Sequence, residues 1–218
     1  MFKKKNILVV GDIMLDKYSH GTVSRVSAEA PVPIVDIKKI SYKPGGASNV
    51  AQNLSALGMN VTLLGITGDD NALKELTKVL RHTAIKFDPV KDLSIRTILK
   101  SRIIGNDQQL MRLDHEDRNK SNMSGELLKR VMKHAKNSDL IILSDYDKGS
   151  VKPIAADIIS FANNNNIKVI IDPKGTDYSM YKNAYMVKPN ELEFSIIMGK
   201  IKNKKDMIAK GKKLKKDL

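Results

Sequence analysis

Apolar residues occur along the chain in two alternating patterns, short continuous runs and stretches with a helical repeat. Continuous runs rich in Val, Ile and Leu are typical of buried strands, and apolar positions three or four residues apart are typical of helices that cover a sheet. Strands are expected in NILVVGD, NVTLLGITGDD, IKFDPV, DLIILSD, IKVIIDP and AYMVKPN. Helices are expected in SNVAQNLSALG, NALKELTKVLRHT, SGELLKRVMKHAKN, VKPIAADIISFANNNN and ELEFSIIMG. This alternation predicts an α/β fold with a mostly parallel central sheet covered by helices.

One region departs from the alternation and predicts a β-hairpin. In IRTILKSRIIGNDQQLMRLDHED, every second residue from Ile95 to Ile103 falls on one side of a period-2 pattern, and residues 105–107 supply a turn. The segment before residue 46 is expected to be extended as well, because Pro31 and Pro33 disfavour a helix. We expect the hairpin to protrude from the main sheet.

The first predicted helix follows two adjacent glycines, Gly45 and Gly46. We expect Ser48 to be its N-cap and Gly58 to lie just beyond its last turn. Two glycines let a ligand approach the backbone closely, a helix N-terminus offers free N–H groups, and Asn49 can add a hydrogen bond to a hydroxyl. A tight turn that simply precedes a helix is an equally good interpretation.

Polar clusters follow four of the predicted strands. Since ligands of parallel sheets gather at the carboxyl ends of the strands, four clusters at the same edge predict a binding site there. The clusters are Gly11-Asp12, Ser144-Asp145, Asp172-Pro173-Lys174 and Pro189-Asn190.

The composition favours an ordinary globular protein. Hydrophobic residues make up 41% and charged residues 28% of the 218 positions, and there is no Cys, which excludes disulfides and thiolate metal sites. The apolar run Ile7–Val10 is far too short for a signal peptide core or a membrane span. We therefore expect a cytoplasmic protein without a membrane partner.

The net charge of +14 raises the alternative of a nucleic-acid-binding role. Against it, there is no Trp, aromatic residues make up only 5% of the chain, and the Lys residues are spread along it apart from a dense run at the end. Base-stacking platforms are therefore scarce, and no nucleic-acid partner is expected.

Carboxylates and lysines in the strand-end loops suit a phosphorylated, polyhydroxylated ligand. Asp12, after the first strand, can accept hydrogen bonds from sugar hydroxyls, whereas the nearby Asp16 is interpreted as a cap or an exposed residue. The loops SDYDKG and DPKG add further Asp residues beside lysines, with Lys suited to phosphate and Asp to hydroxyls. These residues are Asp145, Asp147, Lys148, Asp172 and Lys174. Taken singly, each loop can also be a solvated charged loop.

The segment PNELEF places Asn190 and Glu193 three residues apart at a helix start. The two side chains can hold a hydrated Mg²⁺ beside phosphates, because Mg²⁺ prefers few protein ligands and several waters. They can also form a capping box with Asn190 as N-cap, and both interpretations are compatible. The sequence contains no G-x-x-x-x-G-K-[ST] or G-x-G-x-x-G motif, its four His show no metal-ligand spacing, and no Ser/His/Asp arrangement is apparent.

Eight segments together resemble one family. GDIMLDKY, SRVSAEAPVPIV, KPGGASNVAQNLSALG, LLGITGDD, RLDHE, LSDYDKG, IDPKGTDYSMY and KPNELEF occur in the order found in the ribokinase-like (PfkB) carbohydrate kinases. EAPVPIV with DYDKG and DPKGTDY is more specific and resembles the heptose 7-phosphate kinases, the kinase half of bifunctional ADP-heptose synthesis proteins of Gram-negative bacteria. The resemblance runs from about Ile7 to the last residue.

The resemblance implies a three-layer ribokinase-like fold, a sugar phosphate as acceptor, and ATP with Mg²⁺. Sugar-binding positions would be Asp12, Gly45, Gly46 and Asn49, with Asp145, Lys148 and Asp172 in the same region. Nucleotide-binding positions would be Asn190, Glu191, Leu192 and Glu193, with Glu193 also toward Mg²⁺. Candidates for the substrate phosphate are Arg102, Arg112 and Lys174. Segments of about 17–41 and 95–113 would form a small β-lid over the sugar, through which two subunits pair.

The sequence also departs from the family pattern. A Gly-Ala-Gly-Asp motif supplies the family's anion hole and general base, and it does not occur here, so no catalytic residue is assigned. Lys188 stands where a small hydroxyl residue is expected. We expect the chain to correspond to the first two-thirds of one kinase domain, residues 1–218, without an adenylyltransferase domain and with weak or no activity by itself. The alternatives are a non-catalytic sugar-phosphate-binding remnant and a kinase for another sugar.

Overall fold

The computed structural model describes residues 3–117 and 121–218. Its central sheet has six strands, all parallel, in the order β12-β11-β10-β1-β4-β6. These strands are β1 (Asn6–Gly11), β4 (Asn60–Leu64), β6 (Ile85–Phe87), β10 (Leu140–Ser144), β11 (Lys168–Asp172) and β12 (Met186–Val187). A short pair, β5 (Ile66–Thr67) and β7 (Val90–Lys91), stands apart from it. The mostly parallel sheet expected from the sequence is confirmed.

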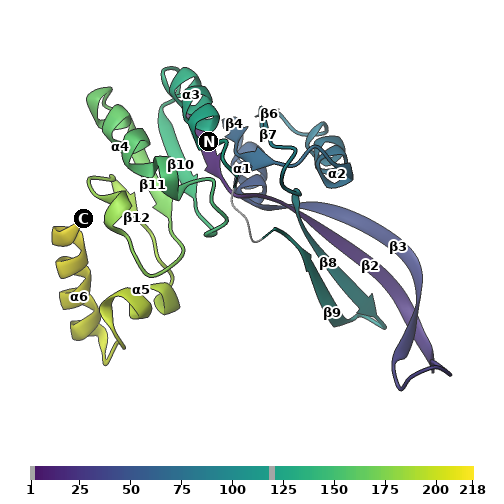
Figure 1. Cartoon of the computed structure of the whole chain (residues 1–218). Coiled ribbons are helices and arrows are strands. Elements are labelled where there is room, and N and C mark those ends of the chain that lie inside the picture. Colours follow the sequence, from purple (N-terminus) through teal and green to yellow (C-terminus); the bar gives the residue numbers. More distant parts are fainter. Residues whose placement is uncertain (1–2, 118–120) are drawn as a thin grey trace.

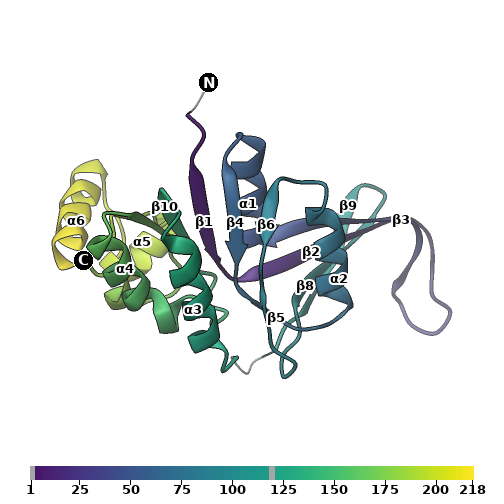
Figure 2. The ribbon, with the colours of Figure 1, turned by 90° about the horizontal axis from the view of Figure 1, so that it is seen from above.

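Helices cover both faces of this sheet and give three layers (Figures 1 and 2). Leu8 and Val10 of β1 pack with the helices on one face, and Ile7 and Val9 pack with those on the other, as expected for a strand buried on both sides. The helices are α1 (Ala47–Ala56) and α2 (Asn71–Leu80) on one face, and α3 (Ser124–Ala135) and α4 (Ala155–Asn164) on the other. Beyond β12 lie α5 (Glu191–Met198) and α6 (Lys204–Asp217), and two 3₁₀ turns are η1 (Lys152–Ile154) and η2 (Ser179–Tyr181).

Four further strands form a second sheet, here called the flanking sheet, that projects from the central one (Figure 1). Its strands are β2 (Ile13–Val26), β3 (Pro33–Gly46), β8 (Ile98–Gly105) and β9 (Gln108–His115), in the order β3-β2-β8-β9. The predicted hairpin is confirmed as β8 and β9, and its turn residues Asn106 and Asp107 have positive φ angles of 50° and 63°. The sequence pattern did not predict that β8 would pair in parallel with β2.

The start of α1 corrects one expectation. Gly46, with φ 53°, is the N-cap, and Ser48 lies buried inside the first turn without a hydrogen-bond partner for its hydroxyl among the described residues. Ser48 is not the N-cap because α1 begins at Ala47, two residues earlier than a helix capped by Ser48 would, directly from the end of β3. Gly58 ends the helix as predicted, with φ 85°.

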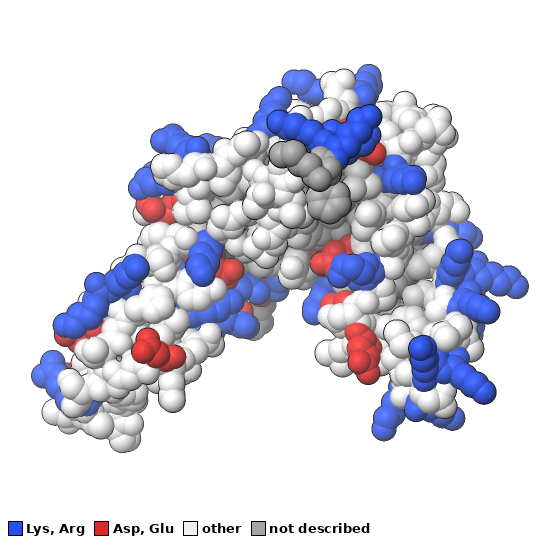
Figure 3. Space-filling model, turned by 180° about the vertical axis from the view of Figure 1, so that it is seen from behind, with Lys and Arg blue, Asp and Glu red and all other residues white. Residues whose placement is uncertain are grey.

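The carboxyl ends of the central strands meet at one edge. Gly11 pairs with Ser144, and Ser144 pairs with Asp172, so the residues that follow β1, β10 and β11 are neighbours. Val187 of β12 pairs in parallel with Ile171 of β11, so the fourth cluster follows a strand at the same edge, and the prediction that the four polar clusters share an edge is confirmed. Figure 3 shows a wide notch on the molecule between the arm formed by the flanking sheet and the C-terminal part of the chain.

Candidate active site

Asp12 organises the loop that follows β10. The side chain is 1% exposed and accepts three backbone hydrogen bonds from that loop. Its Oδ2 accepts the N–H groups of Tyr146 at 2.8 Å and Lys148 at 3.1 Å, and its Oδ1 accepts that of Ser150 at 3.1 Å. All three donors belong to residues 146–150, so the Asp12 carboxylate fixes this loop against the end of β1. The predicted contact of Asp12 with a sugar stays a prediction, and the structure adds a positioning role.

Asp145 is also buried and is bound from inside the protein. It accepts the N–H of Asp147 at 2.6 Å and the hydroxyl of Tyr181, which itself is fully buried. Burial raises the pKa of the Asp145 carboxyl, and the two hydrogen bonds oppose that rise only in part. The structure therefore assigns Asp145 internal partners, which the sequence pattern did not reveal.

A substitution at Asp145 gives the first testable prediction. Because its folded pKa is raised, the ionised carboxyl is less stable in the folded than in the unfolded chain, and the resulting loss of stability appears as pH rises through the unfolded and then the folded pKa. Asp145→Asn keeps an acceptor for Asp147 N–H and is expected to raise the free energy of unfolding at pH 7. Urea unfolding at pH 7 and pH 4 measures this, and a gain that does not shrink toward pH 4 would contradict it.

The two glycines are required by close packing at the end of β3. A Cβ at Gly46 would overlap the carbonyl oxygen of Asp12, and one at Gly45 would overlap the Asp16 carboxylate. The N–H of Ala47, at the start of α1, donates to the same Asp12 carbonyl at 3.0 Å. Asn49 is exposed in the first turn. The tight-turn interpretation is thus sufficient to explain both glycines, and ligand contact by Gly45, Gly46 and Asn49 stays a prediction.

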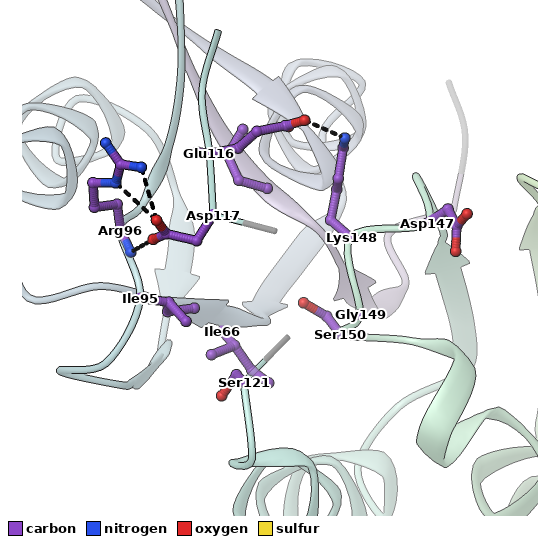
Figure 4. Close-up of a pocket in the computed structure, with 11 residues that line it drawn as sticks. Ile66, Ile95, Arg96, Glu116, Asp117, Ser121, Asp147, Lys148, Gly149 and Ser150 are labelled. Atoms are coloured by element: carbon purple, nitrogen blue, oxygen red, sulfur yellow. Dashed lines mark hydrogen bonds and ion pairs between the residues drawn. The ribbon is translucent and has the colours of Figure 1, made fainter. Parts of the chain in front are cut away.

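A pocket of about 250 Å³ lies where the flanking sheet meets the loop after β10 (Figure 4). Glu116, just beyond β9, accepts a hydrogen bond from the Lys148 ammonium at 2.8 Å. At the left of Figure 4, Arg96 donates to Asp117 Oδ1 from Nη2 at 2.8 Å and from Nε at 3.0 Å. The remaining lining residues are Ile66, Ile95, Ile98, Ser121, Asp147, Gly149 and Ser150. We call this the first pocket.

A second pocket, of about 350 Å³, contains much of the predicted nucleotide region. It is lined by Tyr146, Asp147, Lys148, Lys174, Gly175, Thr176, Leu192, Glu193 and Ile196. Asp147 and Lys148 line both pockets, so the two cavities adjoin at this pair. The structure places Lys148 and Lys174, predicted for the substrate, in one pocket with Glu193, predicted for the nucleotide.

The start of α5 is a capping box, which confirms that interpretation. Asn190 Oδ1 accepts Glu193 N–H at 2.9 Å, and Glu193 Oε2 accepts Asn190 N–H at 2.9 Å. Glu193 Oε1 lies 3.4 Å from the Lys174 ammonium. Glu191 and Leu192 are exposed at the same helix start.

The residues present fit a hydrated Mg²⁺ better than a fully coordinated ion. Among the described residues no three His, Cys, Asp or Glu are grouped to hold a metal. In the part of the chain that the structure describes, the contact of Glu193 Oε1 is the long one with Lys174, so this oxygen can accept a hydrogen bond from a water of a Mg²⁺–phosphate complex. One such contact suits Mg²⁺, which keeps several of its waters.

Several site residues were missed at the sequence level. Lys188, noted only as a departure, forms an ion pair of 2.9 Å with Asp172, which raises the pKa of that lysine. Burial, together with the charges of Glu193, Asp145 and Asp172, raises the pKa of Tyr178 to about 12. Glu116 could have been found from its place in the RLDHE segment, whereas only the fold brings Lys188 to Asp172.

Arg102 and Arg112 are on the flanking sheet rather than in either pocket. Arg102 Nη1 lies 2.5 Å from Asp16 Oδ1, so Asp16 has a partner that the sequence interpretation did not foresee. Arg112 forms two hydrogen bonds with Asp114, at 2.8 and 3.0 Å.

Comparison with known proteins shows which family the chain belongs to. Residues 4–218 match the family described as pfkB family carbohydrate kinase. The chain belongs to the pfkB family. It is 42% identical over 215 residues to the bifunctional protein HldE of Aeromonas hydrophila. The aligned region covers 99% of this chain and 45% of that protein. The chain thus spans less than half the length of this relative.

Two solved kinase structures share the fold. Phosphofructokinase-2 from Escherichia coli, in a tetrameric inhibited form, superposes with a TM-score of 0.76 at 17% identity, covering 97% of this chain and 70% of that chain. Arabidopsis thaliana ribokinase complexed with ribose and ATP superposes with a TM-score of 0.70 at 16% identity, covering 99% and 70%. The ribokinase-like fold expected from the sequence is confirmed. No helix in the part of the chain that the structure describes is long and apolar enough to cross a membrane.

Proposed function

We propose that this pfkB chain supplies the sugar-binding part of an ATP-dependent kinase that phosphorylates the anomeric hydroxyl of D-glycero-D-manno-heptose 7-phosphate, in the route to ADP-heptose for lipopolysaccharide. The observation that carries the proposal is 42% identity, over 99% of the chain, to a bifunctional protein HldE. The motifs EAPVPIV, DYDKG and DPKGTDY support the same heptose acceptor.

The two adjoining pockets suggest where the sugar and the ATP phosphates bind. In our proposal the sugar occupies the first pocket, beneath the flanking sheet, and ATP extends its phosphates into the second pocket beside Lys174 and the start of α5. Lys148, which lines both, is suited to stabilise the negative charge on the phosphoryl group in transfer. ATP with Mg²⁺ would supply the phosphoryl group and neutralise its charge, with Glu193 as the contact toward a Mg²⁺ water.

The flanking sheet would act as the lid of the site. Asp12 fixes the loop that carries Lys148, and Glu116 connects this lysine to the base of the flanking sheet. Closure of the sheet over bound sugar would exclude water, which protects ATP from hydrolysis. We also propose that two subunits pair through this sheet, and that the enzyme works in the cytoplasm, where ATP is available.

Binding selectivity tests the proposed acceptor. The purified chain is titrated by calorimetry with heptose 7-phosphate, fructose 6-phosphate and ribose. Heptose 7-phosphate is expected to bind at least about tenfold more tightly than the other two, a difference of about 1.4 kcal/mol. Tighter binding of fructose 6-phosphate or ribose would contradict heptose 7-phosphate as the acceptor, although the chain would still belong to the pfkB family.

A further inference from the structure

The two faces of the flanking sheet near its base differ in character. Ile13 and Leu15 of β2 pack into the core on the side of α1 and α2. Asp12, which directly precedes β2, turns the other way and binds the loop at residues 146–150. Since side chains alternate along a strand, Asp16 and Tyr18 lie on the same side as Asp12, toward the first pocket. Ile98 of β8 lines that pocket. We call this side the inner face.

The strand register collects cations on the inner face. Asp16 is paired with Lys43 of β3 and with Lys100 of β8. Tyr18 is paired with Arg102, which lies two residues beyond Lys100 on the same side. Arg112 and Asp114 of β9 complete the face opposite Arg102 and Lys100. Four cations, Lys43, Lys100, Arg102 and Arg112, thus stand against two acids, Asp16 and Asp114, which leaves 4 − 2 = +2 charges.

The two acids do not neutralise the two lysines. Asp16 is engaged by Arg102, and Asp114 by Arg112. Within the described ranges, 3–117 and 121–218, Lys43 and Lys100 form no ion pair. The Lys43 ammonium and the Arg102 guanidinium instead approach the ring of Tyr18, at 5.3 and 5.2 Å from its centroid. Cations gathered around one ring, with two lysines unpaired, favour the binding of an added anion.

We propose that Lys43, Lys100 and Arg102 bind the phosphate group that the acceptor sugar already carries. This inference rests on the proposed function, in which the sugar ring of the acceptor occupies the first pocket. It assigns a binding site to the phosphate at the other end of the same sugar. Lys100 is two residues from Ile98, about 7 Å along the strand, a distance that a sugar chain spans. Arg102 offers a planar fork of donors to phosphate oxygens and the lysines offer point charges.

The other two candidates for this phosphate are less suited. Lys174 lies in the second pocket beside Glu193, on the proposed nucleotide side. Arg112 is held by Asp114 through two hydrogen bonds, whereas Arg102 is held by Asp16 through Nη1, so a phosphate would displace more contacts at Arg112 than at Arg102. Of the three candidates that the sequence suggested for the substrate phosphate, the structure thus favours Arg102 over Arg112 and Lys174.

Single substitutions test the assignment with a matched control. Lys100→Ala and Lys43→Ala each remove one cation from the inner face. Lys17→Ala removes the same charge from the position next to Asp16 on β2, on the opposite face. Calorimetric affinities are measured for heptose 7-phosphate, fructose 6-phosphate, unphosphorylated heptose, inorganic phosphate and MgATP, at constant ionic strength and after thermal melting shows equal folding.

Each inner-face variant is expected to weaken binding of phosphorylated sugar by about 10- to 100-fold, since a hydrogen bond to a charged group is worth about 1.5–3 kcal/mol. Affinities for unphosphorylated heptose and for MgATP are expected to stay within about twofold, and Lys17→Ala to change none of them. A uniform loss across all ligands, or a loss of MgATP binding alone, overturns the assignment. If fructose 6-phosphate rather than heptose 7-phosphate shows the effect, the phosphate site stands and the heptose proposal fails.

Discussion

Replacing Asp12 with alanine is expected to lower the free energy of unfolding by about 3 kcal/mol and to abolish measurable sugar-phosphate binding. The carboxylate is buried and accepts the N–H groups of Tyr146, Lys148 and Ser150. Without it, three donors lose their acceptor at once, and the loop can regain hydrogen bonds only by opening to water. An open loop no longer holds Lys148 between the two pockets.

Urea unfolding followed by circular dichroism measures the loss, and hydrogen exchange at residues 146–150 locates it. Asp12→Asn keeps one acceptor oxygen and is expected to give an intermediate loss. Asp36→Ala is the control, because Asp36 is exposed near the outer end of the flanking sheet and forms an ion pair with the exposed Lys38. This control is expected to change stability by less than about 0.5 kcal/mol. A loss below about 1 kcal/mol for Asp12→Ala would contradict the positioning role.

The 218 residues by themselves are expected to bind heptose 7-phosphate but to phosphorylate it at least about 10⁴-fold more slowly than a pfkB kinase that contains the Gly-Ala-Gly-Asp motif. This motif is absent from the sequence. Loss of a general base costs about 10²- to 10⁴-fold, and loss of an anion hole about 10²- to 10³-fold more. In the candidate site, Asp145 is bound by Tyr181 and Asp12 by three N–H groups, so neither is free to take up the proton of a sugar hydroxyl.

A coupled assay for ADP release, with product identified by phosphorus NMR, measures this turnover. The double variant Asn190→Ala/Glu193→Ala serves as the control for contaminating kinases, because it removes the capping box and one of the two acids that line the second pocket, Glu193. Turnover near 1 s⁻¹, typical of kinases, that this variant abolishes would show that another residue acts as the base.

Local patterns were enough to predict most elements of the fold. The apolar run of β1, the helical repeat of α3 and the turn at Asn106–Asp107 each depend on neighbouring residues, and the structure has all three. The shared edge of the strand-end clusters followed from one general rule, that parallel strands align their carboxyl ends. The capping box of Asn190 and Glu193 is likewise a local pattern.

The pairing of distant side chains could not be read from the sequence. Asp16 and Arg102 are 86 residues apart, and they meet because β2 and β8 pair in parallel, which no local signal indicated. Asp12 was predicted to face a sugar, yet its three donors come from residues more than 130 positions away. Ser48 failed as an N-cap for a similar reason, because the end of β3 sets where α1 begins. The residue types of the strand-end loops suggested a class of ligand, whereas the partners of these residues inside the protein depend on the topology.

The central claim is that a phosphorylated sugar binds between the flanking sheet and the loop after β10. The most direct test is a titration of the ¹⁵N-labelled chain with heptose 7-phosphate, followed by two-dimensional NMR of the assigned backbone amides. We predict saturable shifts at residues 98–102, 116 and 146–150, with little change in α3 and α6. Shifts confined to other surfaces, or no saturable shift for heptose 7-phosphate, would contradict the account.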